Sequence, residues 1–169
     1  MITRRGVVGL GVLSMSGSVL GSGAEPHPPA SASSDRDQIA AAIDAFVAAY
    51  NAGDVARIVA YYGDDLIKDR QGAAAETKRE TAARIERFFG QYRGELSVSN
   101  DEIVTSGDLA YTRGTLKIRL APRSGGPAET LERRFLEIWR KREGRWLVVR
   151  TMDNTGAPGD DRNPSGSGA

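Results

Sequence analysis

The stretch from Phe46 to Asp69 constrains the fold most, because it contains two helices that must meet at a corner. A first helix is expected to begin after an N-cap at Ser34 and to end near Gly53, and Asp54 then caps a second, shorter helix. Both segments carry apolar residues at helical spacing: Ile39, Ile43, Phe46, Val47 and Tyr50 in the first, and Val55, Ile58, Val59 and Tyr62 in the second. Each helix therefore needs an apolar surface to pack against.

The rest of the chain predicts one more helix followed by strands. Thr77 and Glu80 form a capping box that opens a third helix, and Gly90 is expected to end it. From Glu95 onward the apolar residues alternate instead of recurring at helical spacing. Strands are expected at residues 66–69, 96–98, 102–105, 109–120, 130–140 and 145–152. The predicted class is α+β, with three N-terminal helices packed on an antiparallel sheet.

The last two strands are apolar on both faces. Pairing them across a turn at residues 142–144 places Trp139 opposite Trp146. One face would then carry Leu136, Ile138, Leu147 and Val149, and the other Phe135, Trp139, Trp146 and Val148. Either the tryptophans stack with each other and with arginine stems at the surface, or a second subunit packs on them. We favour a homodimer through this sheet face, since exposed aromatic patches usually mark contact sites.

The first 24 residues have the pattern of a signal peptide. A positive start is followed by an apolar, uncharged run at residues 6–21 and by the small residues Ser22-Gly23-Ala24 at the cleavage site. A membrane anchor is the alternative, but a spanning helix needs about 20 apolar residues. Arg4 and Arg5 favour twin-arginine export over general secretion. We expect the protein to be periplasmic or extracellular, with no membrane contact after cleavage.

This prediction divides the chain into four parts. The signal peptide at residues 1–24 is followed by a disordered linker at 25–34, the folded domain at 35–154 and a disordered tail at 155–169. Cleavage removes two of the 23 basic residues and none of the 22 acidic ones, which leaves 21 against 22 and a net charge of −1. Such a balance gives no reason to expect a nucleic-acid partner.

Composition also excludes several kinds of catalytic site. The chain has no cysteine, and its one histidine is His27, in the predicted linker. A folded domain without these residues cannot hold a Ser-His-Asp triad, a Cys-His pair or an ordinary zinc site. We therefore expect no metal and no cofactor. Any chemistry would depend on carboxylates, tyrosines, lysines and arginines.

The order of elements, with Ala52-Gly53-Asp54 at the helix corner and Trp139 and Trp146 in the last hairpin, resembles the nuclear-transport-factor-2-like superfamily, which includes SnoaL-like and ketosteroid isomerase-like proteins. Residues 106–114 and 146–154 are most similar to its SgcJ/EcaC-type subgroup. The resemblance implies a curved sheet that forms a cone, with the helices closing one side and a pocket at the open end. Members are commonly dimers.

The same resemblance argues against a standard ketosteroid isomerase mechanism. That mechanism uses a carboxylate base and an oxyanion hole made of a tyrosine and a protonated aspartic acid. Alignment through the shared motifs places Phe46 at the tyrosine position and Leu136 at the aspartate position, so only the base has a candidate, Asp69. An oxyanion-hole donor contributes about 3–4 kcal/mol, so loss of both would leave the enolate without its stabilisation.

Two functional hypotheses stay open. In the first, the domain binds a small apolar or carbonyl-containing molecule in a pocket lined by Phe46, Ile58, Phe88, Leu136, Val149 and Asp153. In the second, it is a small isomerase, cyclase or oxidoreductase-like enzyme, with Asp69 as the base and Tyr50 or Tyr62 as the acid. Structural roles are the alternatives: an ion pair of Asp69 with Lys68 or Arg70, and tyrosines that belong to the core. The absence of the oxyanion-hole donors favours binding.

Overall fold

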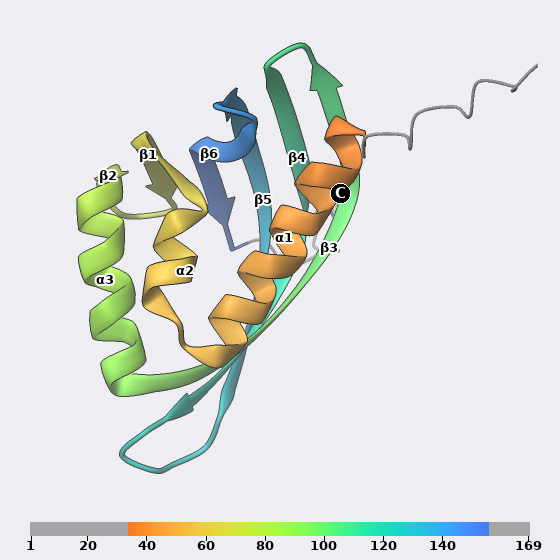
Figure 1. The fold of residues 1–169 in the computed structure, drawn as a ribbon. Helices are drawn as coiled ribbons and strands as arrows, with labels where there is room; N and C mark the ends of the chain where they lie inside the picture. Colours follow the sequence, from red (N-terminus) through yellow and green to blue (C-terminus); the bar gives the residue numbers. More distant parts are fainter. Residues whose placement is uncertain (1–33, 156–169) are drawn as a thin grey trace, which may run out of the picture. The chain divides into compact units, whose positions relative to one another are not determined.

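A computed structural model describes residues 34–155 (Figure 1). The signal peptide, and nearly all of the linker and the tail that the sequence predicts, lie outside these residues. The elements follow in the order α1 (Asp35–Ala52), α2 (Val55–Ala60), β1 (Tyr62–Arg70), β2 (Glu76–Thr77), α3 (Lys78–Gln91), β3 (Tyr92–Ser106), β4 (Leu109–Pro122), β5 (Glu129–Arg142) and β6 (Arg145–Asn154). No helix among the described residues has the length and apolar character needed to cross a bilayer.

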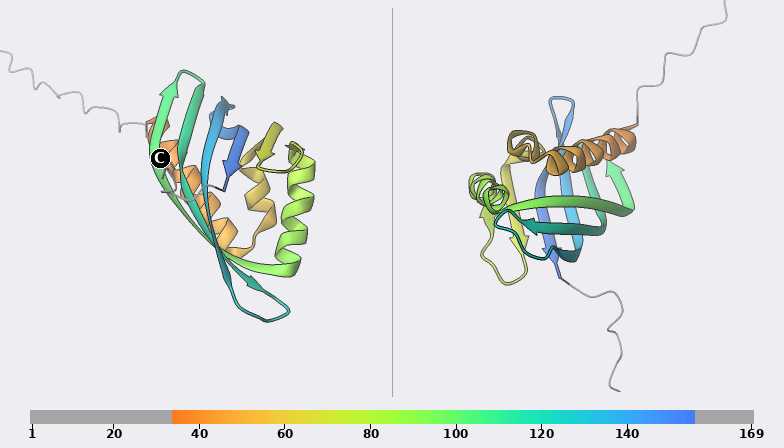
Figure 2. Two further views of the ribbon diagram at one scale, coloured as in Figure 1. Left: turned by 180° about the vertical axis from the view of Figure 1, so that it is seen from behind. Right: turned by 90° about the horizontal axis from the view of Figure 1, so that it is seen from below.

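The strands form one curved, open sheet in the order β2-β1-β6-β5-β4-β3. The three helices lie on one face of it, with α1 against β3 and α3 against β1 (Figures 1 and 2). The predicted α+β class with three helices on a curved sheet is therefore confirmed. The prediction of a wholly antiparallel sheet is wrong, because β1 pairs with β6 in parallel. No hairpin joins these two strands, so no tight turn fixes their relative direction.

Local chemistry sets the helix ends as predicted. Ser34 and Asp37 form a capping box at the start of α1, and Thr77 and Glu80 form another at the start of α3. Gly53 ends α1 with a left-handed φ of 68°, which glycine adopts without steric cost. Two boundaries differ from the prediction. Tyr62 begins β1 instead of ending the second helix, and α3 continues past Gly90.

A bulge bends β3, which the sequence had predicted as two separate strands. The pairing of β3 with β4 continues on both sides of an irregularity between Asn100 and Glu102. Gly114 lies opposite this bulge, and a Cβ atom there would be only 2.0 Å from the carbonyl oxygen of Ser99. A bulge increases the local twist and bend of a strand, so this one contributes to the curvature that creates the concave face.

The last hairpin has a different register from the predicted one. Trp139 pairs with Val148, and Trp146 pairs with Lys141. Two consecutive residues with positive φ, at 51° for Glu143 and 76° for Gly144, form a two-residue turn. A register shift after Ile138 then leaves Val149 at a bulge of β6. The turn conformation and the bulge together explain why simple alternation from the turn gave the wrong partners.

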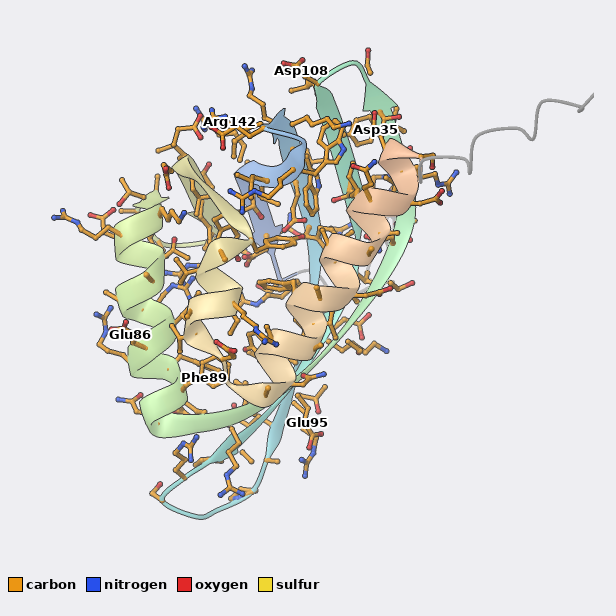
Figure 3. The ribbon with its side chains drawn as sticks, viewed as in Figure 1. Asp35, Glu86, Phe89, Glu95, Asp108 and Arg142 are labelled. Carbon is orange, nitrogen blue, oxygen red and sulfur yellow. The ribbon has the colours of Figure 1, made fainter. Side chains whose placement is uncertain are left out.

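The helices cover the tryptophan face of the sheet. Trp139 is 0% exposed and Trp146 is 5% exposed. Asp35, labelled in Figure 3 at the start of α1, accepts hydrogen bonds from Trp146 Nε1 at 3.1 Å and from Lys141 Nζ at 2.6 Å. The tryptophan face is therefore not the free surface that we predicted for a second subunit. The homodimer itself stays a prediction, which sedimentation of the purified chain would test.

Candidate functional site

A cavity of about 370 Å³ lies between the concave face of the sheet and the helices. Residues of α1, α2 and α3 line one side, and residues of β1 and β3 to β6 line the other. Its volume is within the range of roughly 300–1,000 Å³ that is typical of small-molecule pockets. The cavity is thus large enough to enclose a small ligand.

One part of the cavity is apolar. The register of β3, β4 and β5 places Leu96, Ile118 and Leu131 in one row across the sheet, and all three line the cavity. Phe88 of α3 and Tyr92 of β3 also line it, with ring centroids 5.6 Å apart in a stacked arrangement. This apolar part can bury a hydrocarbon or aromatic group.

Another part of the cavity, here called the basic wall, is lined by Lys68, Arg70, Arg84 and Arg133. The carboxylate of Asp153 also lines the cavity and is engaged on both oxygens. Oδ1 accepts a hydrogen bond from Arg133 Nη1 at 2.6 Å, and Oδ2 is 3.2 Å from Lys68 Nζ. With a side chain only 8% exposed, Asp153 is held firmly between two cations.

Glu76 of β2 holds the other two cations of the basic wall. Its carboxylate accepts hydrogen bonds from Arg70 Nη2 at 2.5 Å and from Arg84 Nε at 2.8 Å. These bonds lower the pKa of Glu76, although partial burial acts in the opposite direction. The basic wall therefore has four positive charges in ion pairs with two carboxylates, Glu76 and Asp153, and the Glu137 carboxyl is a third acid within electrostatic reach of Lys68.

Two guanidinium nitrogens of the basic wall have no hydrogen-bond partner. Among residues 34–155, Arg70 Nε and Arg133 Nε are the buried side-chain nitrogen or oxygen atoms that lack one. A buried donor without a partner costs about 1–3 kcal/mol of stability, more for a charged group. Such donors are rare in folded proteins and need an explanation. A bound ligand or an ordered water that accepts the hydrogen bond would provide one.

Two tyrosine hydroxyls complete the polar lining. Burial raises the pKa of Tyr50 to about 12, while the charges of Arg84 and Arg133 partly oppose that rise. Burial also raises the pKa of Tyr62, and the nearby Glu137 carboxyl adds to this effect. Both hydroxyls are therefore protonated at neutral pH and can donate a hydrogen bond. Neither has a hydrogen-bond partner within the described part of the chain.

The comparisons with known proteins place this geometry in a family. The sequence profile described as the SnoaL-like domain matches residues 43–149, which is more than half of the chain. The chain belongs to the SnoaL-like domain family. Structural neighbours described as ketosteroid isomerase-like and NTF2-like support the wider nuclear-transport-factor-2-like superfamily, so the predicted resemblance is confirmed at that level.

Several solved structures resemble this SnoaL-like domain. A conserved protein from Planctomyces limnophilus is 27% identical over 72% of this chain and 96% of that one, with a TM-score of 0.70. A ketosteroid isomerase-like protein from Erwinia carotovora is 25% identical over 75% and 100%, with a TM-score of 0.66. An NTF2-like protein with a cystatin-like fold from Novosphingobium aromaticivorans, 16% identical over 75% and 84% with a TM-score of 0.63, shares the fold. Curated proteins gave no match.

The cavity of the SnoaL-like domain collects six of the nine predicted site residues. They are Phe46, Tyr50, Ile58, Tyr62, Phe88 and Asp153. Asp69 does not line the cavity, whereas its neighbours Lys68 and Arg70 do. Because side chains alternate along β1, Asp69 lies on the opposite face of the sheet, where it is paired with Met152. The ion pairs suggested for Asp69 are absent too, since Lys68 contacts Asp153 and Arg70 contacts Glu76.

Two predicted pocket residues also lie elsewhere. Leu136 is 44% exposed on the face of the sheet opposite the helices. Val149, at the bulge of β6, is 5% exposed but does not line the cavity, and its Cγ1 lies 3.1 Å from where a Cβ atom of Gly63 would be. Both predictions are wrong because they assumed that the helices cover the face of Leu136, whereas the helices cover the opposite face, which carries Trp139 and Trp146.

The basic wall and a half-buried acid beside the cavity, Glu137, were not predicted from the sequence. Glu137 Oε2 accepts a hydrogen bond from the Tyr61 hydroxyl at 2.9 Å and from Thr112 Oγ1 at 3.4 Å. Thr112 Oγ1 in turn accepts one from Trp139 Nε1 at 3.0 Å. Burial raises the pKa of Glu137, although these hydrogen bonds and Lys68 oppose the rise. Alternation with Phe135 and Trp139 could have revealed Glu137 as inward-facing.

This half-buried acid predicts a distinctive pH dependence. Because the folded state raises the pKa of Glu137, its contribution favours folding below the ordinary glutamate pKa and is lost as the pH rises through the folded value. A Glu137→Gln variant lacks this titration. The difference in unfolding free energy, variant minus wild type, should therefore increase as the pH rises above the ordinary glutamate pKa. Urea unfolding at several pH values measures this difference.

The matched control for that experiment is Glu102→Gln on the opposite face. Hydrogen bonds from Arg113 and Tyr111 lower the pKa of Glu102, so its contribution is present above the ordinary glutamate pKa and is lost as the pH falls. The free-energy difference for Glu102→Gln, variant minus wild type, should accordingly decrease as the pH rises toward the ordinary glutamate pKa and stay constant above it. Equal slopes for the two variants would contradict the assignment of Glu137.

Proposed function

We propose that this SnoaL-like domain binds a small amphipathic molecule in the cavity between its sheet and helices. The observation that carries the proposal is the division of one cavity into an apolar part around Leu96, Ile118 and Leu131 and a polar part formed by the basic wall. Small-molecule sites usually combine a mainly apolar lining with a few polar groups that fix the orientation of the ligand.

Binding is better supported than acid-base catalysis. A general base needs a carboxylate that is within reach of the ligand and free to accept a proton. Asp69 lies on the opposite face, and the carboxylate that lines the cavity, Asp153, has both oxygens engaged by Arg133 and Lys68. Glu137 does not line the cavity and accepts from Tyr61. The tyrosine hydroxyls can orient a carbonyl or another acceptor without transferring a proton.

The experiment uses two probes of equal chain length, decanoate and decan-1-ol, with the full chain. A ligand present at 100 times its dissociation constant stabilises the folded state by about 2.7 kcal/mol, which a thermal unfolding measurement detects. We expect at least one probe to raise the unfolding temperature. Leu116→Trp, which fills the cavity from β4, should abolish the shift. Leu136→Trp, on the opposite face, should preserve it. The proposal fails if neither probe binds, or if Leu116→Trp binds as well as the wild type.

A further inference from the structure

We infer that the ligand has an anionic head group of the carboxylate class, seated on Arg70 and Arg133 of the basic wall. This inference rests on the proposed function and adds the charge of the ligand to it. The first reason is a local excess of positive charge, since the four cations of the basic wall form ion pairs with two carboxylates, Glu76 and Asp153, and the excess is still one when Glu137 near Lys68 is charged. A monocarboxylate would reduce this excess without reversing it.

The second reason is that the guanidinium groups are only partly used. Arg133 bonds Asp153 through Nη1, and Arg70 bonds Glu76 through Nη2, while the Nε of each arginine is buried without a partner. Guanidinium presents several donors in a planar fork that matches the two oxygens of a carboxylate. An alcohol or a ketone has one oxygen for these donors, whereas a carboxylate can accept from both arginines at once.

The third reason is that the two arginines lie close to the same point. Arg70 is paired with Asp153 across β1 and β6, and Asp153 is paired with Phe135, two residues after Arg133 on β5. Arg133 also contacts Asp153 directly. The neutral hydroxyl of Tyr50 is within the electrostatic reach of Arg84 and Arg133, so it adds a donor and no negative charge.

The apolar part of the cavity indicates that the group attached to the carboxylate is apolar. Leu116 and Arg133 are paired in one row of the sheet, and Leu96, Ile118 and Leu131 form the next row on the same face. The apolar surface therefore continues directly from the basic wall. A carboxylate at the basic wall would therefore direct an attached alkyl or aryl group toward these side chains. The chemical class is a carboxylic acid with one apolar alkyl or aryl group.

Isothermal titration of the full chain with decanoate and decan-1-ol tests the inference. We expect decanoate to bind at least about tenfold more tightly at neutral pH, because its head forms charge-assisted hydrogen bonds. Arg133→Met should reduce this preference by about tenfold or more while changing the dissociation constant of decan-1-ol by less than about threefold. Arg70→Lys keeps the charge but loses the Nε donor, so it should reduce the preference less. If Arg133→Met does not fold, Arg70→Lys still tests the inference.

A matched control is Arg113→Met on the opposite face of the sheet. Arg113 pairs with Asp101 and Glu102, so its loss should leave the preference for decanoate unchanged. The outcomes separate the two proposals. If neither probe binds, the proposed function itself fails. If decan-1-ol binds as tightly as decanoate, or if Arg133→Met and Arg70→Lys both keep the wild-type preference, a pocket exists but the anionic head group is wrong.

Discussion

Replacing Trp139 with alanine should lower the free energy of unfolding by about 3–5 kcal/mol. Trp139 is 0% exposed, and its ring lies 4.9 Å from that of Tyr61 in an edge-to-face arrangement. Its Nε1 also donates to Thr112, so the variant would lose both the packing of a large side chain and a buried hydrogen bond. Urea unfolding monitored by far-ultraviolet circular dichroism measures the change.

Two further variants separate these contributions. Leu136→Ala, on the same strand but 44% exposed on the opposite face, should cost about 1 kcal/mol or less. Trp139→Phe keeps an aromatic ring but removes the donor to Thr112, so its cost should be intermediate. A loss below about 1 kcal/mol for Trp139→Ala would show that the hairpin register places this residue wrongly.

The helices could be predicted from the sequence because their signals are local. Ser34, Gly53 and Thr77 determine helix ends through their own side chains or backbone conformation, and each does so in the structure. The class of fold followed from the change of hydrophobic spacing near Glu95. These inferences need no knowledge of which strands are neighbours.

The face of the sheet that the helices cover could not be predicted in the same way, because both faces of the last hairpin are apolar. The structure keeps Leu136 and Ile138 on the face opposite Trp139, as simple alternation predicts, but the helices cover the tryptophan face. Leu136 is therefore exposed and is not a pocket residue. The parallel pairing of β1 with β6 brings Arg70 beside Asp153, two residues that are 83 positions apart in the sequence (153 − 70).

The basic wall was missed for a related reason. Lys68, Arg70, Arg84 and Arg133 occur on three separate elements, and each alone has the appearance of an ordinary solvated charge. Only the arrangement of β1, α3 and β5 around Asp153 and Glu76 concentrates them in one cavity. Membership of the SnoaL-like family does not predict these four cations either, because proteins of one fold have many functions and differ in their site residues.

Asp153 offers the sharpest combined test, because its charge should have opposite effects on stability and binding. Asp153→Asn leaves Lys68 and Arg133, with side chains 13% and 24% exposed, without their carboxylate. Breaking a fully buried ion pair costs about 3–5 kcal/mol, and the partial exposure here reduces the expected loss of unfolding free energy to about 2–3 kcal/mol. Urea unfolding measures this loss. Asp101→Asn, a 47% exposed acid paired with Arg113, is the control and should change stability by about 0.5 kcal/mol or less.

The same Asp153→Asn variant should bind decanoate more tightly, although it is less stable. Removing one negative charge raises the local excess of positive charge by one and frees donors of Arg133 and Lys68 for the ligand. At an effective dielectric constant of about 20, a unit charge removed a few ångströms from the carboxylate changes its affinity by about tenfold or more. Decan-1-ol should bind the variant and the wild type about equally. A variant that loses affinity for decanoate would instead make Asp153 a partner of the ligand and contradict an anionic head group at this wall.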